Sequence, residues 1–164
     1  MTQLKFNMSI KDKYEVVIGL EVHAQLLTKT KAYSSDINEY GAHPNTNVSV
    51  ITLGHPGTLP VMNKKTIEFA VKLGLACGCT IAEHQHFARK NYFYPDLPKG
   101  YQITQDTTPI CTGGSIVIKG EDGQEKTIGL TRIHMEEDAG KSIHDVDLYD
   151  TLVDLNRAGT PLLE

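Results

Sequence analysis

Tryptophan is absent from this 164-residue chain, and cysteine occurs only three times. An odd number of irregularly spaced cysteines does not form a disulfide framework and favours a reducing compartment. Cys77 and Cys79 could be half of a metal site, but no second pair of thiols follows them. The alternative, reduced thiols just after a helix, therefore fits the spacing better.

Long apolar runs are also missing. No stretch approaches the roughly 20 apolar residues that a membrane-spanning helix needs, so we expect no membrane association. Residues 1–13 lack both the apolar centre of a secretory signal and the arginines of an organellar transit peptide. We interpret them as a short leader.

Positive charge is scarce for a protein that would bind a polyanion. Lysine and arginine number 16 against 20 aspartates and glutamates, a net charge of −4. Domains that bind nucleic acid through its phosphates are usually basic. If a nucleic acid is a partner, most of its contacts should therefore lie outside these residues.

The hydropathy pattern indicates one domain with many strands and one helix. Alternation over residues 14–27 predicts a strand that turns four apolar side chains to the core, namely Val16, Ile18, Leu20 and Val22. A helix is expected from Lys64 to about Cys77, capped by Asn63 and stopped by Gly78. Further strands are predicted over 81–94, 101–104, 115–119, 126–136 and 147–155. The predicted class is α+β.

An acidic cluster stands out within residues 132–141, where Glu136, Glu137 and Asp138 follow one another. Adjacent carboxylates repel one another unless cations neutralise them. A strand end before a glycine-containing loop can hold Mg²⁺, and Lys141 is close enough in sequence to contact a phosphate. The alternative is a solvated acidic turn.

A second pair of possible ligands lies near the start of the chain. Strand alternation would place Glu21 and His23 side by side on the face away from the core. A carboxylate and an imidazole suit Mg²⁺, Mn²⁺ or Zn²⁺, whereas a plain surface location is the alternative. The metal hypothesis requires that this pair and the acidic cluster converge.

Cations and aromatic residues are mixed in residues 89–95. Arg89 and Lys90 could pair with phosphate, and the following aromatic residues could stack on a base or belong to the core. The sequence contains neither a P-loop nor a dinucleotide-binding glycine fingerprint nor a nucleophile elbow.

Seven stretches, in order along the chain, resemble a known family. They are 17–23 (VIGLEVH), 44–47 (PNTN), 56–61 (PGTLPV), 89–96 (RKNYFYPD), 101–103 (YQI), 132–141 (RIHMEEDAGK) and 153–162 (VDLNRAGTPL). Together they are similar to the B subunits of aspartyl/glutamyl-tRNA amidotransferases, over nearly all of residues 14–164.

The resemblance implies a fold and a reaction. The fold would be a strand-rich cradle similar to the glutamine synthetase core, of which residues 14–164 form an incomplete N-terminal part. The reaction would use ATP and Mg²⁺ to phosphorylate the side-chain carboxylate of Glu-tRNA(Gln) or Asp-tRNA(Asn). Ammonia from the glutaminase A subunit would then displace the phosphate, in an assembly with the small C subunit. A cytoplasmic location in bacteria or archaea, rather than in an organelle, is implied.

Residue roles follow from the same resemblance. Glu21, His23, Glu136 and Glu137 match metal-binding positions, with Glu136 and Glu137 as catalytic residues. Arg89, Lys90 and Lys141 are phosphate contacts inferred from their charge. Many family members carry four zinc-binding cysteines, and the matching positions are Ser34, Asp36, Ser49 and Thr52. None is a thiolate, so we expect these four side chains to lie near one another without a structural zinc.

The ending of the sequence raises a further expectation. Family members are longer, so we expect a truncated chain that is inactive alone, with tRNA held mainly by the missing domains. Apolar side chains near the end, Leu152, Val153, Leu155, Leu162 and Leu163, would lose their cover. The competing hypotheses are a non-catalytic docking fragment of the same assembly and a glutamine-synthetase-like ligase for a small carboxylate.

Overall fold

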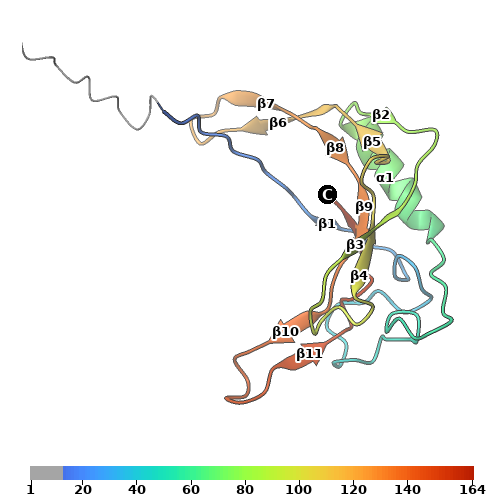
Figure 1. Cartoon of the computed structure of the whole chain (residues 1–164). Helices are drawn as coiled ribbons and strands as arrows, with labels where there is room; N and C mark the ends of the chain where they lie inside the picture. The colour runs from blue at the N-terminus through green and yellow to red at the C-terminus, as the bar shows by residue number, and fades with distance from the viewer. Residues whose placement is uncertain (1–12) are drawn as a thin grey trace, which may run out of the picture.

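The computed structural model describes residues 13–164, so nearly all of the expected leader lies outside the described residues. Figure 1 shows a curved molecule with a β-hairpin at each end. Strands β6 (Ser115–Lys119) and β7 (Glu125–Gly129) form one hairpin, and β10 (Lys141–Ile143) and β11 (Leu152–Asp154) form the other. Helix α1 (Lys64–Ala76) lies on the outer side of the curve, and the end of the chain lies on the inner side.

A three-stranded antiparallel sheet forms the middle of the molecule. Its order is β1 (Ala24–Gln25), β12 (Pro161–Leu163) and β9 (Met135–Glu137). Ala24 lies opposite Leu163, which in turn lies opposite Met135. This sheet therefore brings the start of the described chain, its end and the acidic cluster together.

The strand predicted over residues 14–27 is mostly not formed, because only Ala24–Gln25 is strand. Residues 14–23 run as a separate trace along the inner side of the curve (Figure 1). The four side chains expected in the core are instead 75% to 84% exposed. A strand needs a neighbour for its backbone N–H and C=O groups, and no strand among the described residues pairs with 14–23.

Other predicted strands are shorter than the alternation suggested. The run over 81–94 divides into β2 (Thr80–Ile81) and β3 (Ala88–Asn91), which belong to different sheets. The second strand of the predicted hairpin divides into β7, β8 (Arg132–Ile133) and β9. Strand β5 (Cys111–Thr112) pairs with β2 on one side and with β8 on the other. Strand β3 pairs with β4 (Tyr101–Thr104) in a separate two-stranded sheet.

The local predictions with a distinct turn or cap are confirmed. The β6–β7 hairpin and strand β4 occur where they were expected. Helix α1 begins after Asn63, whose side chain accepts a hydrogen bond from the Lys65 N–H at 2.9 Å. Gly78, with φ of 67°, follows the helix end in the left-handed conformation that glycine adopts readily. Strand β10 was missed because residues 138–141 suggested a loop, and in the predicted strand 147–155 only β11 is formed.

The main hydrophobic core lies between α1 and the two three-stranded sheets. It consists of Ala70, Ile110, Cys111, Ile133, Met135 and Leu163, each at most 5% exposed. Leu162 and Leu163, expected to be uncovered, are buried, so the exposed apolar surface lies mainly elsewhere, including residues 14–22. Among residues 13–164, no helix has the length and apolarity required to cross a bilayer.

The fold class is strand-rich with one helix in the described part of the chain, in agreement with the predicted α+β class. The similarity to the glutamine synthetase core stays a prediction.

Candidate functional site

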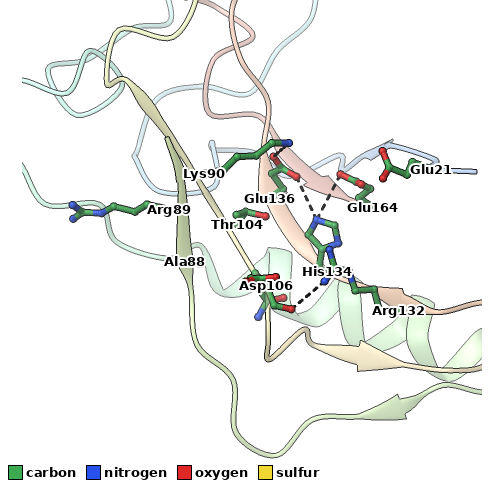
Figure 2. Close-up of a pocket in the computed structure, with 11 residues that line it drawn as sticks. Glu21, Ala88, Arg89, Lys90, Thr104, Asp106, Arg132, His134, Glu136 and Glu164 are labelled. Atoms are coloured by element: carbon green, nitrogen blue, oxygen red, sulfur yellow. Dashed lines mark hydrogen bonds and ion pairs between the residues drawn. The ribbon is translucent and has the colours of Figure 1, made fainter. Parts of the chain in front are cut away.

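A pocket of about 340 Å³ opens on the inner side of the curved molecule. Its walls come from β3, the end of β4, β8–β9, the segment before β1, and the last residue of the chain (Figure 2). The residues that line it are Glu21, Ala88, Arg89, Lys90, Thr104, Gln105, Asp106, Arg132, His134, Glu136 and Glu164.

Three side chains in this pocket form a possible ligand set. One ligand atom each from His134, Glu136 and Glu164 lies within 4.8 Å of the other two. Nε2 of His134 is 3.4 Å from a carboxylate oxygen of Glu136 and 3.6 Å from one of Glu164. The arrangement follows from strand geometry: residues two apart on a strand face the same side, and the backbones of His134 and Glu164 exchange two hydrogen bonds.

The pair predicted near the start of the chain reaches the same pocket. Nε2 of His23 lies 3.0 Å from a carboxylate oxygen of Glu164, and Glu21 lines the pocket (Figure 2). The expectation that Glu21, His23 and one acidic residue of the cluster face a common cleft within reach of one cation stays a prediction: Glu21 and one cluster residue line the pocket, and His23 contacts Glu164 at its edge. Glu136 is that residue.

The charge balance of the pocket favours an ionised Glu136. Burial, with only 3% of its side chain exposed, would raise the pKa of this carboxyl group. His134 and the Lys90 ammonium, whose Nζ lies 3.6 Å away, outweigh that effect and lower the pKa below its usual range. Nδ1 of His134 is buried and has no hydrogen-bond partner among the described residues.

The basic residues predicted as phosphate contacts divide between different places. Lys90 points to Glu136 over the pocket, whereas the Arg89 side chain extends away from it (Figure 2). The Arg89 guanidinium instead lies over the Tyr101 ring, 4.7 Å from its centre. Lys141 is exposed on β10 opposite Asp154 and does not line the pocket.

Glu137 does not join the ligand set, because its carboxylate lies on the other face of β9. It accepts a hydrogen bond from the Ile103 N–H at 2.9 Å and pairs with Lys99. A small second cavity lies on that side, lined in part by Glu137, Lys99, Lys31 and Tyr33. The expectation that both glutamates belong to one metal set is corrected by strand alternation, which sends neighbouring side chains to opposite faces.

The four positions that match family cysteines do lie together, as expected. A carboxylate oxygen of Asp36 accepts hydrogen bonds from the Ser49 N–H at 2.9 Å and from the Thr52 hydroxyl. The hydroxyl oxygen of Ser34 accepts one from the Asp36 N–H at 3.3 Å. Burial opposes ionisation of Asp36, but its hydrogen bonds to Thr52 and Ser49 and the nearby Lys31 lower its pKa.

Arg132, His134 and Glu164 line the pocket but were not among the predicted site residues. The first two carried a signal, since Arg132, His134 and Glu136 alternate along one predicted strand face. Arg132 Nη1 donates to the Asp106 carbonyl at 3.0 Å, which holds its guanidinium at the pocket wall. Glu164 had no local signal, because only its pairing with β9 and its contact with His23 bring it to the site.

Comparison with known proteins agrees with the resemblance noted in the sequence. Residues 16–164 match the family model described as the GatB/GatE catalytic domain. Over 152 residues, 93% of the chain, it is 59% identical to the B subunit of the aspartyl/glutamyl-tRNA(Asn/Gln) amidotransferase of Alkalilimnicola ehrlichii. It is 60% identical over 92% of its length to the protein of the same name from Hydrogenovibrio crunogenus.

In both cases the aligned part is 32% of the relative, so the chain spans about a third of the length of these proteins. The match to the family model, over residues 16–164, covers all of the pocket-lining residues and both hairpins. The chain belongs to the GatB/GatE catalytic domain family.

Proposed function

We propose that this domain supplies the phosphoryl-transfer site of a tRNA-dependent amidotransferase. A side-chain carboxylate oxygen of glutamate or aspartate on tRNA attacks the γ-phosphorus of ATP, and ADP leaves. The nitrogen of ammonia then attacks the acyl carbon, the bond to the phosphate oxygen breaks, and loss of a proton leaves the amide. The family membership, the names of the relatives and the chemistry of the pocket support this proposal.

The observation that carries the proposal is the convergence of His134, Glu136 and Glu164 within 4.8 Å. Carboxylate oxygens are the ligands that Mg²⁺ prefers, and an imidazole nitrogen also suits Mn²⁺. We propose that these three residues hold a divalent cation, with His23 and Glu21 beside them. When bound, the cation neutralises charge on the phosphates.

The residues around this set have distinct proposed roles. We propose that Lys90, exposed over the pocket, and Arg132, held at its wall, pair with phosphate oxygens of ATP. Phosphoryl transfer depends mainly on positioning and charge neutralisation, so such cations suffice without a nucleophilic side chain. Arg89 and Lys141 remain predicted phosphate contacts, but neither side chain is directed to the ligand set.

The wider assembly is part of the proposal. The glutaminase A subunit would release the ammonia, the small C subunit would complete the complex, and further domains would hold the tRNA. The net charge of −4 supports a tRNA site outside this domain. A likeness of the curved strand arrangement in Figure 1 to the glutamine synthetase cradle is part of this proposal. We propose a location in the cytoplasm of a bacterial or archaeal cell.

Cation binding tests the site directly on the 164-residue chain. Mn²⁺ affinity would be measured by electron paramagnetic resonance, with Mg²⁺ as competitor. We expect Glu164→Gln to weaken binding by about 10-fold or more, since it removes a charged ligand, and His23→Asn to weaken it less. Glu121→Gln, an exposed substitution in the β6–β7 turn, serves as the charge-matched control. Equal affinity of Glu164→Gln and Glu121→Gln would contradict the site.

The reaction itself is tested in a full-length protein that carries this domain and is assembled with its partners. Glu164→Gln should abolish ATP-dependent amidation of Glu-tRNA(Gln) or Asp-tRNA(Asn) while glutamine hydrolysis continues, because the two half-reactions use separate sites. Unchanged amidation would favour a docking role for the domain. ATP-dependent amidation of free glutamate without tRNA would favour a ligase for small carboxylates.

A further inference from the structure

Among the described residues, strand β9 has one edge without a backbone partner. Strand β12 pairs with its other edge, where the backbones of His134 and Glu164 exchange two hydrogen bonds. Backbone groups that face one neighbour recur every second residue in an antiparallel ladder, so those of Met135 and Glu137 face away from β12. Strand β4 lies beside β9, yet no backbone ladder joins these two strands within residues 13–164.

Side chains take the place of that ladder. Oε1 of Gln105 accepts the Met135 N–H at 3.0 Å. Nε2 of Gln102 donates to the Glu137 carbonyl at 2.7 Å. The Glu137 carboxylate completes the connection by accepting the Ile103 N–H at 2.9 Å. Buried backbone groups that would be costly to leave unpaired are thus satisfied by side chains that reach from one strand to the other.

The amide of Gln105 is held in one orientation. Gln105 is only 1% exposed, and its Oε1 also accepts the Ile110 N–H at 3.1 Å. Its Nε2 donates to Oε1 of Gln85 at 2.6 Å and to the Thr108 carbonyl at 3.3 Å. A side-chain amide offers two acceptor sites and two donor hydrogens, so all four are used. A fully satisfied buried group therefore fixes the position of the Met135 N–H, between the two pocket residues His134 and Glu136.

The other glutamine lies opposite a residue of the pocket. In the β3–β4 register Gln102 pairs with Lys90, whose Nζ lies 3.6 Å from a carboxylate oxygen of Glu136. The side chain of Gln102 is bonded to the carbonyl of the residue that follows Glu136. The two connections form a closed loop across the gap between β4 and β9. A shift of Gln102 against β9 would consequently move Lys90 against Glu136.

The space between the two strands belongs to the pocket. A backbone ladder would hold β4 and β9 about 4.7–4.9 Å apart, whereas glutamine side chains between the strands need more room. Thr104 and Gln105 line the pocket on the β4 side, and His134 and Glu136 line it on the β9 side. Figure 2 shows these two walls, with the Lys90 side chain reaching from β3 to Glu136.

We propose that Gln102 and Gln105 are positioning residues, which hold the β3–β4 wall at a fixed distance from β9. They thereby align Lys90 with Glu136 and keep the pocket open for its ligand, without being ligands themselves. The spacing role stands on the hydrogen bonds, while its consequence for cation binding rests on the proposed function. Residues that orient metal ligands from behind change metal affinity by about 10- to 100-fold when they are replaced.

Methionine substitutions of the two glutamines test the proposal on the 164-residue chain. Methionine nearly keeps the length of the side chain but lacks the amide donors and carbonyl acceptor. Gln102→Met is the sharper variant, because Gln102 does not line the pocket and acts on it only through position. We expect each variant to weaken Mn²⁺ binding by about 10-fold or more in titrations followed by electron paramagnetic resonance. If Gln105→Met does not fold, Gln102→Met decides alone.

Two controls separate positioning from a general loss of stability. Gln124→Met, in the exposed β6–β7 turn, is the matched glutamine replacement. Gly74→Ala perturbs the core from within α1, where an added Cβ collides with the Cys111 thiol, and Gly74 does not line the pocket. Both controls should bind Mn²⁺ like the wild type. Unchanged affinity in the glutamine variants, or an equal loss in Gly74→Ala, would overturn the proposal.

Nuclear magnetic resonance without metal distinguishes failure of this inference from failure of the proposed function. The nuclear Overhauser contact between the side-chain methylenes of Lys90 and Glu136 reports the spacing directly. It should weaken or vanish in Gln102→Met and Gln105→Met and persist in Gln124→Met. If the wild type binds no Mn²⁺, the proposed cation site fails and this contact alone decides the spacing role. A contact that stays unchanged in both glutamine variants would overturn it.

Discussion

The carboxylates of Glu136 and Glu137 lie on opposite faces of β9, although the two residues are neighbours in the sequence. Glu136 faces the pocket, with His134 Nε2 at 3.4 Å and Lys90 Nζ at 3.6 Å. Glu137 faces the interior on the other side, where it pairs with Lys99 and accepts the Ile103 N–H. An acidic pair that resembles one metal-binding motif is therefore divided between a ligand set and a buried ion pair.

This division predicts different effects of the same substitution. Glu136→Gln should lower Mn²⁺ affinity by about 10-fold or more while the free energy of unfolding falls by only about 1 kcal/mol. Glu137→Gln should lower the free energy of unfolding by about 3 kcal/mol, because it leaves the Lys99 ammonium buried without its partner. Urea denaturation and metal titration of both variants measure the contrast. The reverse pattern would refute the assignment of faces.

Lys31 predicts a dependence of stability on alkaline pH. Its side chain is fully buried, and burial lowers the pKa of its ammonium to about 8, with Asp36 and Glu137 opposing the shift. The folded protein therefore releases this proton near pH 8, whereas the unfolded chain holds it to about pH 10.4. Because the unfolded state binds more protons in this window, this group should make unfolding less favourable as pH rises.

The Lys31→Met variant isolates this contribution. Cys111, whose pKa burial raises to about 11, acts in the opposite direction, so the wild-type curve alone does not resolve Lys31. The free energy of unfolding of the wild type minus that of the variant should increase between about pH 8 and 10.4. Denaturation at several pH values measures it, and a constant difference would show that Lys31 keeps an ordinary pKa.

The lowered pKa of Asp36 predicts that the stability of the fold decreases at acidic pH. Asp36 is also one of the four positions at which many family members bind zinc. Its lowered pKa means that the ionised carboxylate stabilises the fold above the unfolded pKa of about 3.9, and that this stability is lost as pH falls through the lower folded pKa. Asp36→Asn should cost about 1–3 kcal/mol at pH 7 and flatten the acid dependence. Elemental analysis should find no stoichiometric zinc in the wild type; zinc that disappears in Asp36→Asn would contradict this assignment.

Gly74 predicts a steric effect inside α1. Alanine normally favours a helix interior over glycine by about 1 kcal/mol. Here an added Cβ would lie 2.7 Å from Cδ1 of Ile81 and would also collide with the Cys111 thiol. Gly74→Ala should therefore destabilise the protein by about 1–3 kcal/mol. Gly19→Ala, where nothing lies within 4 Å of the added atom, is the control and should have little effect in thermal denaturation.

Helices and hairpins that depend only on residues adjacent in the sequence were predictable. Helix α1 has its own cap at Asn63 and its own stop at Gly78, and the β6–β7 hairpin contains its turn. The alternation of Arg132, His134 and Glu136 placed these side chains on one face, which the pocket confirms. The strand over 14–27 was predicted from the same period, but a period alone does not provide the partner that completes a strand.

The sequence by itself thus determined the elements that contain their own cap or turn, and the family. The tertiary structure alone decided which ligands meet. His23 and Glu164 are 141 residues apart, and their contact exists because β12 inserts between β1 and β9. Arg89 was likewise indistinguishable from Lys90 in sequence, and only the β3–β4 pairing turned one to Tyr101 and the other to Glu136. Long-range strand pairing is set by the packing of the whole chain, because no local pattern specifies which distant strand becomes the neighbour.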